Sequence, residues 1–85
     1  MEKWRKRPVE VEAVQLTREN GPEVWEWADS KPFYGPTGEV EGLTIFTLEG
    51  RLTAQFGDWV VKGVRGKFHP VKPEIFAETH ERVEQ

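Results

Sequence analysis

The residues best suited to chemistry are five cations grouped in the C-terminal third of the chain. They are Lys62, Arg65, Lys67, His69 and Lys72. Cationic side chains hold phosphates and carboxylates by charge and hydrogen bonding, so the group predicts a site for a nucleotide, another small anion or an acidic protein surface. The same residues are also typical of a solvated sheet face whose edge lysines discourage aggregation. Both interpretations place the cations on a hairpin.

Aromatic residues form a second group of candidate binding residues. Phe33 and Tyr34 lie in a segment rich in Pro and Gly, where they either contact a partner or tuck into the core. Trp25 falls away from the apolar side of a predicted helix, so we expect it to be the most exposed tryptophan. Together with Trp4 and Trp59 these rings could form a stacking surface, although small domains also use such rings to fill their cores.

Catalytic groups are scarce in this chain. It contains no Cys, which excludes disulfides, thiolate chemistry and Cys-based zinc sites. His69 and His80 lack the spacing of a metal-binding motif, and Ser30 does not lie in a nucleophile elbow. We interpret Asp58, which follows Gly57, as a turn carboxylate that accepts bonds from backbone N–H groups. The prediction is a protein that is not an enzyme and holds no cofactor or metal.

Length and composition predict one small domain over residues 1–85. The net charge of -3 argues against nucleic acid as a partner, and no apolar run is long enough to span a membrane. Small secreted domains usually need disulfides, so the absence of Cys favours a cytoplasmic location.

The N-terminal half predicts a strand over residues 7–16, a helix over 20–29, and an ordered loop or flap over 30–42. Asn20 is expected to cap the helix, with Glu23 completing a capping box. Residues 1–6 and 82–85 are expected to fray.

The C-terminal half predicts two hairpins and a helix that begins at Pro73. The first hairpin covers 43–56 with Glu49-Gly50 as its turn, which pairs Ile45 with Ala54. The second has Arg65-Gly66 as its turn, which places Lys62 opposite His69 on one face. Residues with a structural role in this half are predicted to be Gly57, Asp58, Trp59, Gly63, Gly66, Pro70, Pro73 and Phe76.

These elements follow the order strand, helix, four strands, helix. The prediction is an α+β domain with a small, curved, mostly antiparallel sheet of about five strands, which could roll into a partly open barrel. Free edges near Pro8 or Pro70 could pair two copies into a homodimer.

Two blocks of this sequence resemble a family of small uncharacterised proteins from bacteriophages and prophages. They are RKRPVEVEAVQLT over residues 5–17 and GDWVVKGVRGKFHPVKPEIFAETHE over residues 57–81. Members of the family typically carry a basic start, a KPV.VEA.QWT-type first strand and a GD(Y/W)xxKGxxGxxxPxKPxIF block. The resemblance implies a phage-encoded protein in the cytoplasm of an infected host, and it implies no activity.

This chain departs from the family pattern at several positions. His69 and His80 stand where Tyr is common, Val71 where Cys or Val occurs, and Lys67 where Glu is frequent. A function that needs that Tyr hydroxyl or that thiol could not be carried by this chain.

The expected function is therefore binding. The first hypothesis is an accessory protein that binds a host protein or defence component through the cationic hairpin and the segment around Phe33 and Tyr34. The alternative is a protein that binds or sequesters a nucleotide or other small anionic ligand, held by Lys62, Arg65 and Lys72 and stacked on an exposed ring. A minor virion or assembly component is a second alternative.

Overall fold

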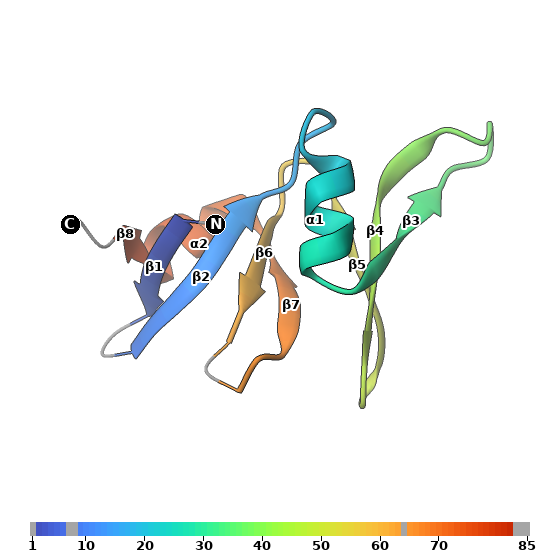
Figure 1. Ribbon diagram of the computed structural model, residues 1–85. Coiled ribbons are helices and arrows are strands. Elements are labelled where there is room, and N and C mark those ends of the chain that lie inside the picture. Colours follow the sequence, from blue (N-terminus) through green and yellow to red (C-terminus); the bar gives the residue numbers. More distant parts are fainter. Residues whose placement is uncertain (1, 7–8, 64, 83–85) are drawn as a thin grey trace.

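Two antiparallel sheets and two helices make up the fold, shown in Figure 1 as a computed structural model that describes residues 2–6, 9–63 and 65–82. Within these residues the strands are β1 (Glu2–Lys6), β2 (Val9–Gln15), β3 (Ser30–Tyr34), β4 (Val40–Thr47), β5 (Gly50–Gln55), β6 (Trp59–Lys62), β7 (Phe68–Val71) and β8 (Glu81–Arg82). The helices are α1 (Gly21–Trp27) and α2 (Pro73–Thr79). The predicted α+β class and the antiparallel pairing are confirmed, with more strands than the sequence indicated.

The strands form two separate sheets rather than one curved sheet. The large sheet has the order β7-β6-β2-β1-β8, and the small sheet has the order β3-β4-β5. The chain leaves the large sheet after β2, forms α1 and the small sheet, and returns to the large sheet at β6 (Figure 1). The sheets do not close into a barrel.

Apolar side chains from both sheets and from α1 fill the space between the sheets. Val24 and Ala28 lie one helical turn apart, so they point to the same side of α1. Leu43 and Ile45 alternate along β4 with more exposed neighbours, as expected for a sheet with one covered face. The buried members of this first core are Val14, Leu16, Val24, Ala28, Leu43, Ile45, Ala54 and Val60.

A second core lies between the large sheet and α2. Its buried members are Ala13, Val61 and Phe76. Trp59 stacks on the Phe76 ring with 4.1 Å between the ring centroids, and Trp4 meets the Trp59 ring edge-on at 4.9 Å. Trp59 and Trp4 are therefore core residues, and β6 is covered on both faces.

The two ends of the described chain, residues 2–6 and 81–82, form strands that pair with each other, whereas the fraying expected at residues 1 and 83–85 lies outside the described residues. Trp4 lies opposite Val11 on β2 and opposite Arg82 on β8. Aromatic packing of Trp4 on Phe76, with 4.7 Å between the centroids, holds β1 against the second core. The sequence could not indicate this strand, because two of its contacts, β8 and Phe76 on α2, come from the other end of the chain.

The expected loop over 30–42 is a strand in its first part. β3 pairs with β4 from Ser30, opposite Ile45, to Tyr34, opposite Val40, with a bulge between Phe33 and Tyr34. β3 is an edge strand of the small sheet, and at an edge a proline such as Pro32 is tolerated because its missing N–H need not pair. The Pro and Gly residues of this segment therefore predicted a loop where the structure has an edge strand.

The N-terminus of α1 does not use the predicted cap. Asn20 occupies the N-cap position, but its side chain makes no capping bond. Its Oδ1 instead accepts a bond from the Thr17 N–H (2.8 Å), and its Nδ2 donates to the Gln15 carbonyl (2.8 Å). Asn20 thus shapes the turn that joins β2 to α1.

The β4–β5 hairpin is shifted by two residues from the predicted register. Ile45 lies opposite Leu52 and Thr47 opposite Gly50, so Leu48 and Glu49 form the turn. The Thr47 hydroxyl closes this turn by donating to the Gly50 carbonyl (2.7 Å) and accepting from the Glu49 N–H (3.2 Å). A shift of two keeps every side chain on its predicted face, because side chains alternate with a period of two.

Candidate functional site

The cationic residues of the C-terminal third occupy the β6–β7 hairpin and the start of α2. The Gly63 N–H donates to the Lys67 carbonyl (2.8 Å), and the Gly66 N–H donates to the Gly63 carbonyl (2.9 Å). Gly66 has φ of 77°, which is the left-handed conformation that ends a three-residue hairpin connection. The connection is therefore one residue longer than predicted.

That extra residue changes which side chains share a face. Lys62 lies opposite Phe68, and His69 lies opposite Val61. Lys62 and His69 therefore point to opposite faces of the sheet, and the prediction that they share one is wrong. The Lys62 ammonium lies 5.9 Å from the Phe68 ring centroid, on the side of the first core.

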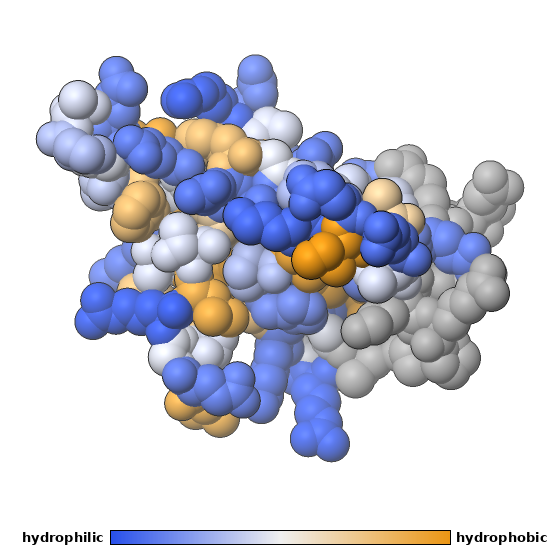
Figure 2. Space-filling view, turned by 180° about the vertical axis from the view of Figure 1, so that it is seen from behind, coloured by the Kyte–Doolittle hydropathy of each residue, from blue (hydrophilic) through white to orange (hydrophobic). Residues whose placement is uncertain are grey.

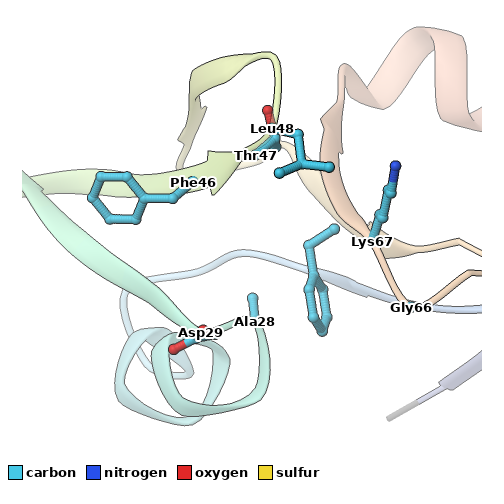
Figure 3. Close-up of a pocket in the computed structure, with 8 residues that line it drawn as sticks. Ala28, Asp29, Phe46, Thr47, Leu48, Gly66 and Lys67 are labelled. Carbon is cyan, nitrogen blue, oxygen red and sulfur yellow. The ribbon is translucent and has the colours of Figure 1, made fainter.

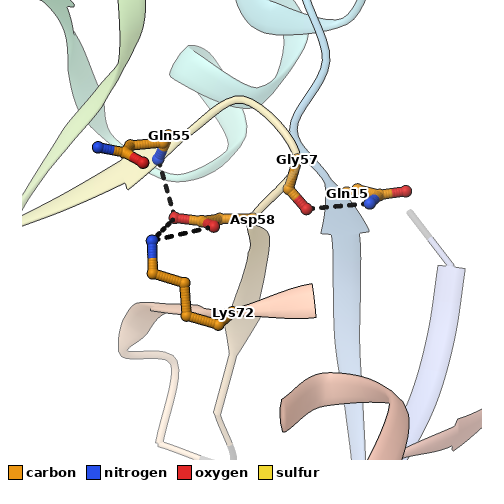
Figure 4. Close-up of polar contacts among 5 residues, drawn as sticks. All are labelled: Gln15, Gln55, Gly57, Asp58 and Lys72. Carbon is orange, nitrogen blue, oxygen red and sulfur yellow. Dashed lines mark hydrogen bonds and ion pairs between the residues drawn. The ribbon is translucent and has the colours of Figure 1, made fainter. Parts of the chain in front are cut away.

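Lys72 is engaged in a structural contact. Its Nζ lies 3.3 Å from Oδ2 of Asp58, whose side chain is buried. The same oxygen accepts a bond from the Gln55 N–H (3.0 Å), as Figure 4 shows. Asp58 is thus the predicted turn carboxylate, and its charge leaves Lys72 less suited to hold a ligand anion.

Gly57 and Asp58 also join the two sheets. The Gly57 N–H donates to the Leu16 carbonyl (2.8 Å), and the Leu16 N–H donates to the Asp58 carbonyl (2.9 Å). The Gln15 side-chain amide donates to the Gly57 carbonyl (2.9 Å; Figure 4). These contacts fix the end of β2 to the segment between β5 and β6, so this conspicuous sequence motif has a structural role.

A pocket of about 450 Å³ lies where the tips of the two hairpins meet the end of α1 (Figure 3). We call it the tip pocket, and its lining residues are Ala28, Asp29, Phe46, Thr47, Leu48, Gly66, Lys67 and Phe68. Phe68 forms its inner wall, where the ring packs edge-on against Trp27 with 5.0 Å between the centroids. The pocket combines apolar walls with one cation and one carboxylate.

Leu48 at the rim of the tip pocket is almost entirely exposed, at 93%. It occupies a turn closed by the Thr47 hydroxyl, so the backbone holds it away from either core. Phe46, at 52% exposure, borders the same pocket. Sequence reasoning missed this tip because it placed the turn one residue later, although an apolar residue beside Glu49-Gly50 was a usable signal.

The predicted aromatic residues do not join the cations. Phe33 and Tyr34, with 39% and 59% of their surface exposed, lie on β3, whereas Arg65 and Lys67 lie in the β6–β7 connection. In Figure 1 the outer end of β3 and that connection lie far apart in the molecule. The structure thus separates the two halves of the predicted binding surface.

Trp25 is half-buried rather than exposed. It packs against the first core and lines a second pocket of about 400 Å³, whose other lining residues are Arg18, Gly21, Pro22, Glu39, Val40 and Phe56. The Arg18 guanidinium lies 4.7 Å from the Phe56 ring centroid, which is a cation–π arrangement. All four tryptophans are half-buried, and the Trp25 ring helps to close this edge of the core.

The remaining groups with chemical potential are dispersed. Within the described residues no three His, Asp or Glu side chains come close enough to hold a metal ion. No helix among those residues is long and apolar enough to cross a membrane. On the side of the molecule seen in Figure 2, apolar atoms reach the surface as separate spots among hydrophilic side chains.

Comparisons with protein-family models, with curated proteins and with solved structures found no match to this chain. The resemblance to small phage and prophage proteins therefore stays a prediction.

Proposed function

We propose that this chain is a phage-encoded accessory protein without enzymatic activity, which binds a host protein in the cytoplasm of an infected cell. The proposed binding surface is the tip pocket together with the hairpin tips that border it. The observation that carries the proposal is the exposure of Leu48, at 93%, beside an apolar pocket of about 450 Å³.

An exposed leucine alone needs no explanation, but this one lies in a particular setting. Leu48 and Phe46 border a hollow whose inner wall is Phe68, so a partner side chain could pack between Leu48 and Phe68. Lys67 lines the same hollow, and Arg65 lies exposed two residues before it. Protein interfaces typically combine an apolar centre with a charged rim, which this arrangement offers to a partner with acidic residues.

The polar groups around the tip pocket favour binding over catalysis. The Thr47 hydroxyl is occupied by the backbone of its own turn. Asp29 and Lys67 are exposed, and neither has the apolar, water-excluding surroundings that prepare a catalytic acid or base.

Affinity capture from a bacterial host lysate tests this proposal. We expect a tagged wild-type chain to retain a specific protein, and Leu48→Asp and Lys67→Glu to lose it. Ile75→Asp is the matched control, since Ile75 is 53% exposed on α2, away from the tip pocket. Retention of the same protein by the Leu48 and Lys67 variants would exclude the tip pocket as the binding surface.

The alternative of a small anionic ligand has less support. Two of the three side chains predicted to hold the anion already have other contacts, because Lys72 is paired with Asp58 and Lys62 lies near the Phe68 ring. A thermal-shift panel of nucleotides tests it, because a ligand that binds only the native state raises the melting temperature. A shift of several degrees that Arg65→Ala removes would replace the proposed function with this alternative.

A further inference from the structure

The outer face of the small sheet, which is turned away from the first core, presents two aromatic rings to solvent. Opposed residues of antiparallel strands share a face, and Leu43, Ile45 and Ala54 are buried on the inner face. The opposite parity defines the outer face, whose positions are Lys31, Phe33, Gly42, Thr44, Phe46, Arg51, Thr53 and Gln55. Its two rings, Phe33 and Phe46, are 39% and 52% exposed.

The charge of this face differs in sign from that of the chain. The eight outer-face positions include two cations, Lys31 and Arg51, and no carboxylate, whereas the whole chain has a net charge of -3. Two carboxylates adjoin the face: Glu41 is the extra residue of the β4 bulge, next to Gly42, and Asp29 lies two residues before Lys31. The net charge used to argue against nucleic acid therefore does not describe this surface.

The rings and cations alternate across the three strands. Lys31 lies opposite Thr44, which lies opposite Thr53, and Phe46 lies opposite Arg51. Phe33 lies opposite Gly42, four residues before Phe46, which separates the two aromatic positions by roughly 14 Å at the usual rise per strand residue and spacing between strands. One short extended chain could reach both rings.

We propose that the outer face binds single-stranded nucleic acid. Bases stack on Phe33 and Phe46, while Lys31 and Arg51 contact the phosphates between and beside them. Exposed rings on a sheet, accompanied by cations and neutral hydrogen-bonding groups, are the elements of sequence-tolerant single-strand binding. Thr53 and Gln55 are exposed and supply those neutral groups.

A base is a better occupant of this face than a protein side chain. A planar base gains its contact from one face of one ring and needs no cavity. Of the two rings, Phe46 borders the tip pocket and Phe33 borders neither of the two pockets described above. This inference goes beyond the proposed function, because it uses a different class of partner and a surface whose residues, apart from Phe46, do not line the tip pocket.

Fluorescence anisotropy with labelled oligothymidylate and oligouridylate of about eight nucleotides, within the usual site size of such surfaces, tests the proposal. We expect binding at low salt, with log affinity falling against log salt at a slope of about -1.4 for two phosphate contacts. Phe33→Ala or Phe46→Ala should each lower the affinity about tenfold. Ile75→Ala is the control for loss of an exposed apolar side chain, and it should leave the affinity unchanged.

Charge variants keep the test independent of the aromatic substitutions. Lys31→Glu combined with Arg51→Glu should abolish binding, whereas Asp29→Asn combined with Glu41→Gln should strengthen it. All four positions are exposed, and circular dichroism checks that each variant is folded. Leu48→Asp should leave oligonucleotide binding intact while it removes the proposed protein partner, so the two proposals fail separately.

Three results would overturn the inference. The first is no binding of either oligonucleotide at low salt. The second is binding that survives both the aromatic and the charge variants and is lost instead with Lys67→Glu. The third is binding of a poly-glutamate peptide as tight as that of the oligonucleotides, which would assign the face to acidic proteins.

Discussion

The large and small sheets differ in how many of their faces are covered. In the large sheet Val60 points into the first core and Val61 into the second, so β6 is buried between two layers. In the small sheet Leu43 and Ile45 are buried while Thr44 and Phe46 on the other face are partly or largely exposed. The large sheet is therefore covered on both faces at β6, whereas the small sheet has one face that can present side chains to a partner.

The aromatic residues follow the same division. Trp4, Trp59 and Phe76 pack together in the second core, with centroid separations of 4.1 to 4.9 Å. Phe33 and Phe46 have no such cover and remain exposed on the small sheet. A buried aromatic ring stabilises the fold, whereas an exposed ring is available for contact with a partner. The sheet face on which a ring lies therefore predicts its role better than its residue type.

The largest expected effect is on the doubly covered sheet. Phe76→Ala removes the ring between Trp59 and His80, and it should lower the free energy of unfolding by about 3–5 kcal/mol. Urea denaturation followed by circular dichroism measures this loss. Ile75→Ala on the same helix is the control, because Ile75 is exposed. An equal loss of stability there would contradict the burial of only the Phe76 side of α2.

The pairing of β4 with β5 in the small sheet also tolerates little change in its backbone. A Cβ on Gly42 would collide with the Ala54 carbonyl oxygen on the neighbouring strand. Gly42→Ala should therefore destabilise by about 1–3 kcal/mol, the usual cost of overpacking. Gly63→Ala is the matched control in urea denaturation, because its Cβ would lie 3.5 Å from the Lys67 carbonyl oxygen, an ordinary contact. Equal stability of the two variants would contradict the close approach of β4 and β5.

Substitution of Asp58 and of Lys72, which form an ion pair beside the segment that joins the two sheets, should lower the stability by different amounts. Asp58→Ala leaves the Gln55 N–H without its side-chain acceptor and should cost about 1–2 kcal/mol. Lys72→Gln should cost about 0–1 kcal/mol, because the Lys72 side chain is 54% exposed and exposed ion pairs contribute little. Thermal unfolding of the two variants measures the difference, and a larger loss for Lys72→Gln would show that the ion pair is the main contact.

The smallest effect on stability is expected at the exposed rim. Leu48→Ser should change the free energy of unfolding by no more than about 0.5 kcal/mol, because the side chain is 93% exposed. Thermal unfolding alongside Phe76→Ala checks this prediction. A loss above 1 kcal/mol would mean that Leu48 is buried in solution, and it would remove the main support for the tip pocket as a docking surface.

The two hairpins show how far sequence reasoning reaches. Both were predicted, and both registers were wrong, by two residues for β4–β5 and by one for β6–β7. The first error kept the faces, so the buried Leu43 and Ile45 were still assigned correctly. The second error exchanged the faces and paired Lys62 with His69, because a three-residue connection was taken for a two-residue turn.

The candidate site was predicted only in part for the same reason. Residue types identified the cationic hairpin and named Phe33 and Tyr34 as candidate binding residues, and the structure shows both to be exposed. Their separation in space depends on how the two sheets pack, which no local pattern encodes. Leu48 was missed because its exposure follows from a turn position one residue away from the expected one.

The sequence by itself determined the α+β class, the two hairpins and the role of Asp58 as a turn carboxylate. These features depend on apolar periodicity, turn residues and side-chain-to-backbone bonds that act over a few residues. Tertiary structure alone decided that residues 2–6, 30–34 and 81–82 are strands, that Trp25 is half-buried, and that the tip of β4–β5 meets the cationic hairpin. The β1–β8 pairing and the meeting of the hairpin tips join segments far apart in the chain, and β3 forms against β4 despite its Pro and Gly, so their free energy comes from pairing and packing that no local pattern encodes.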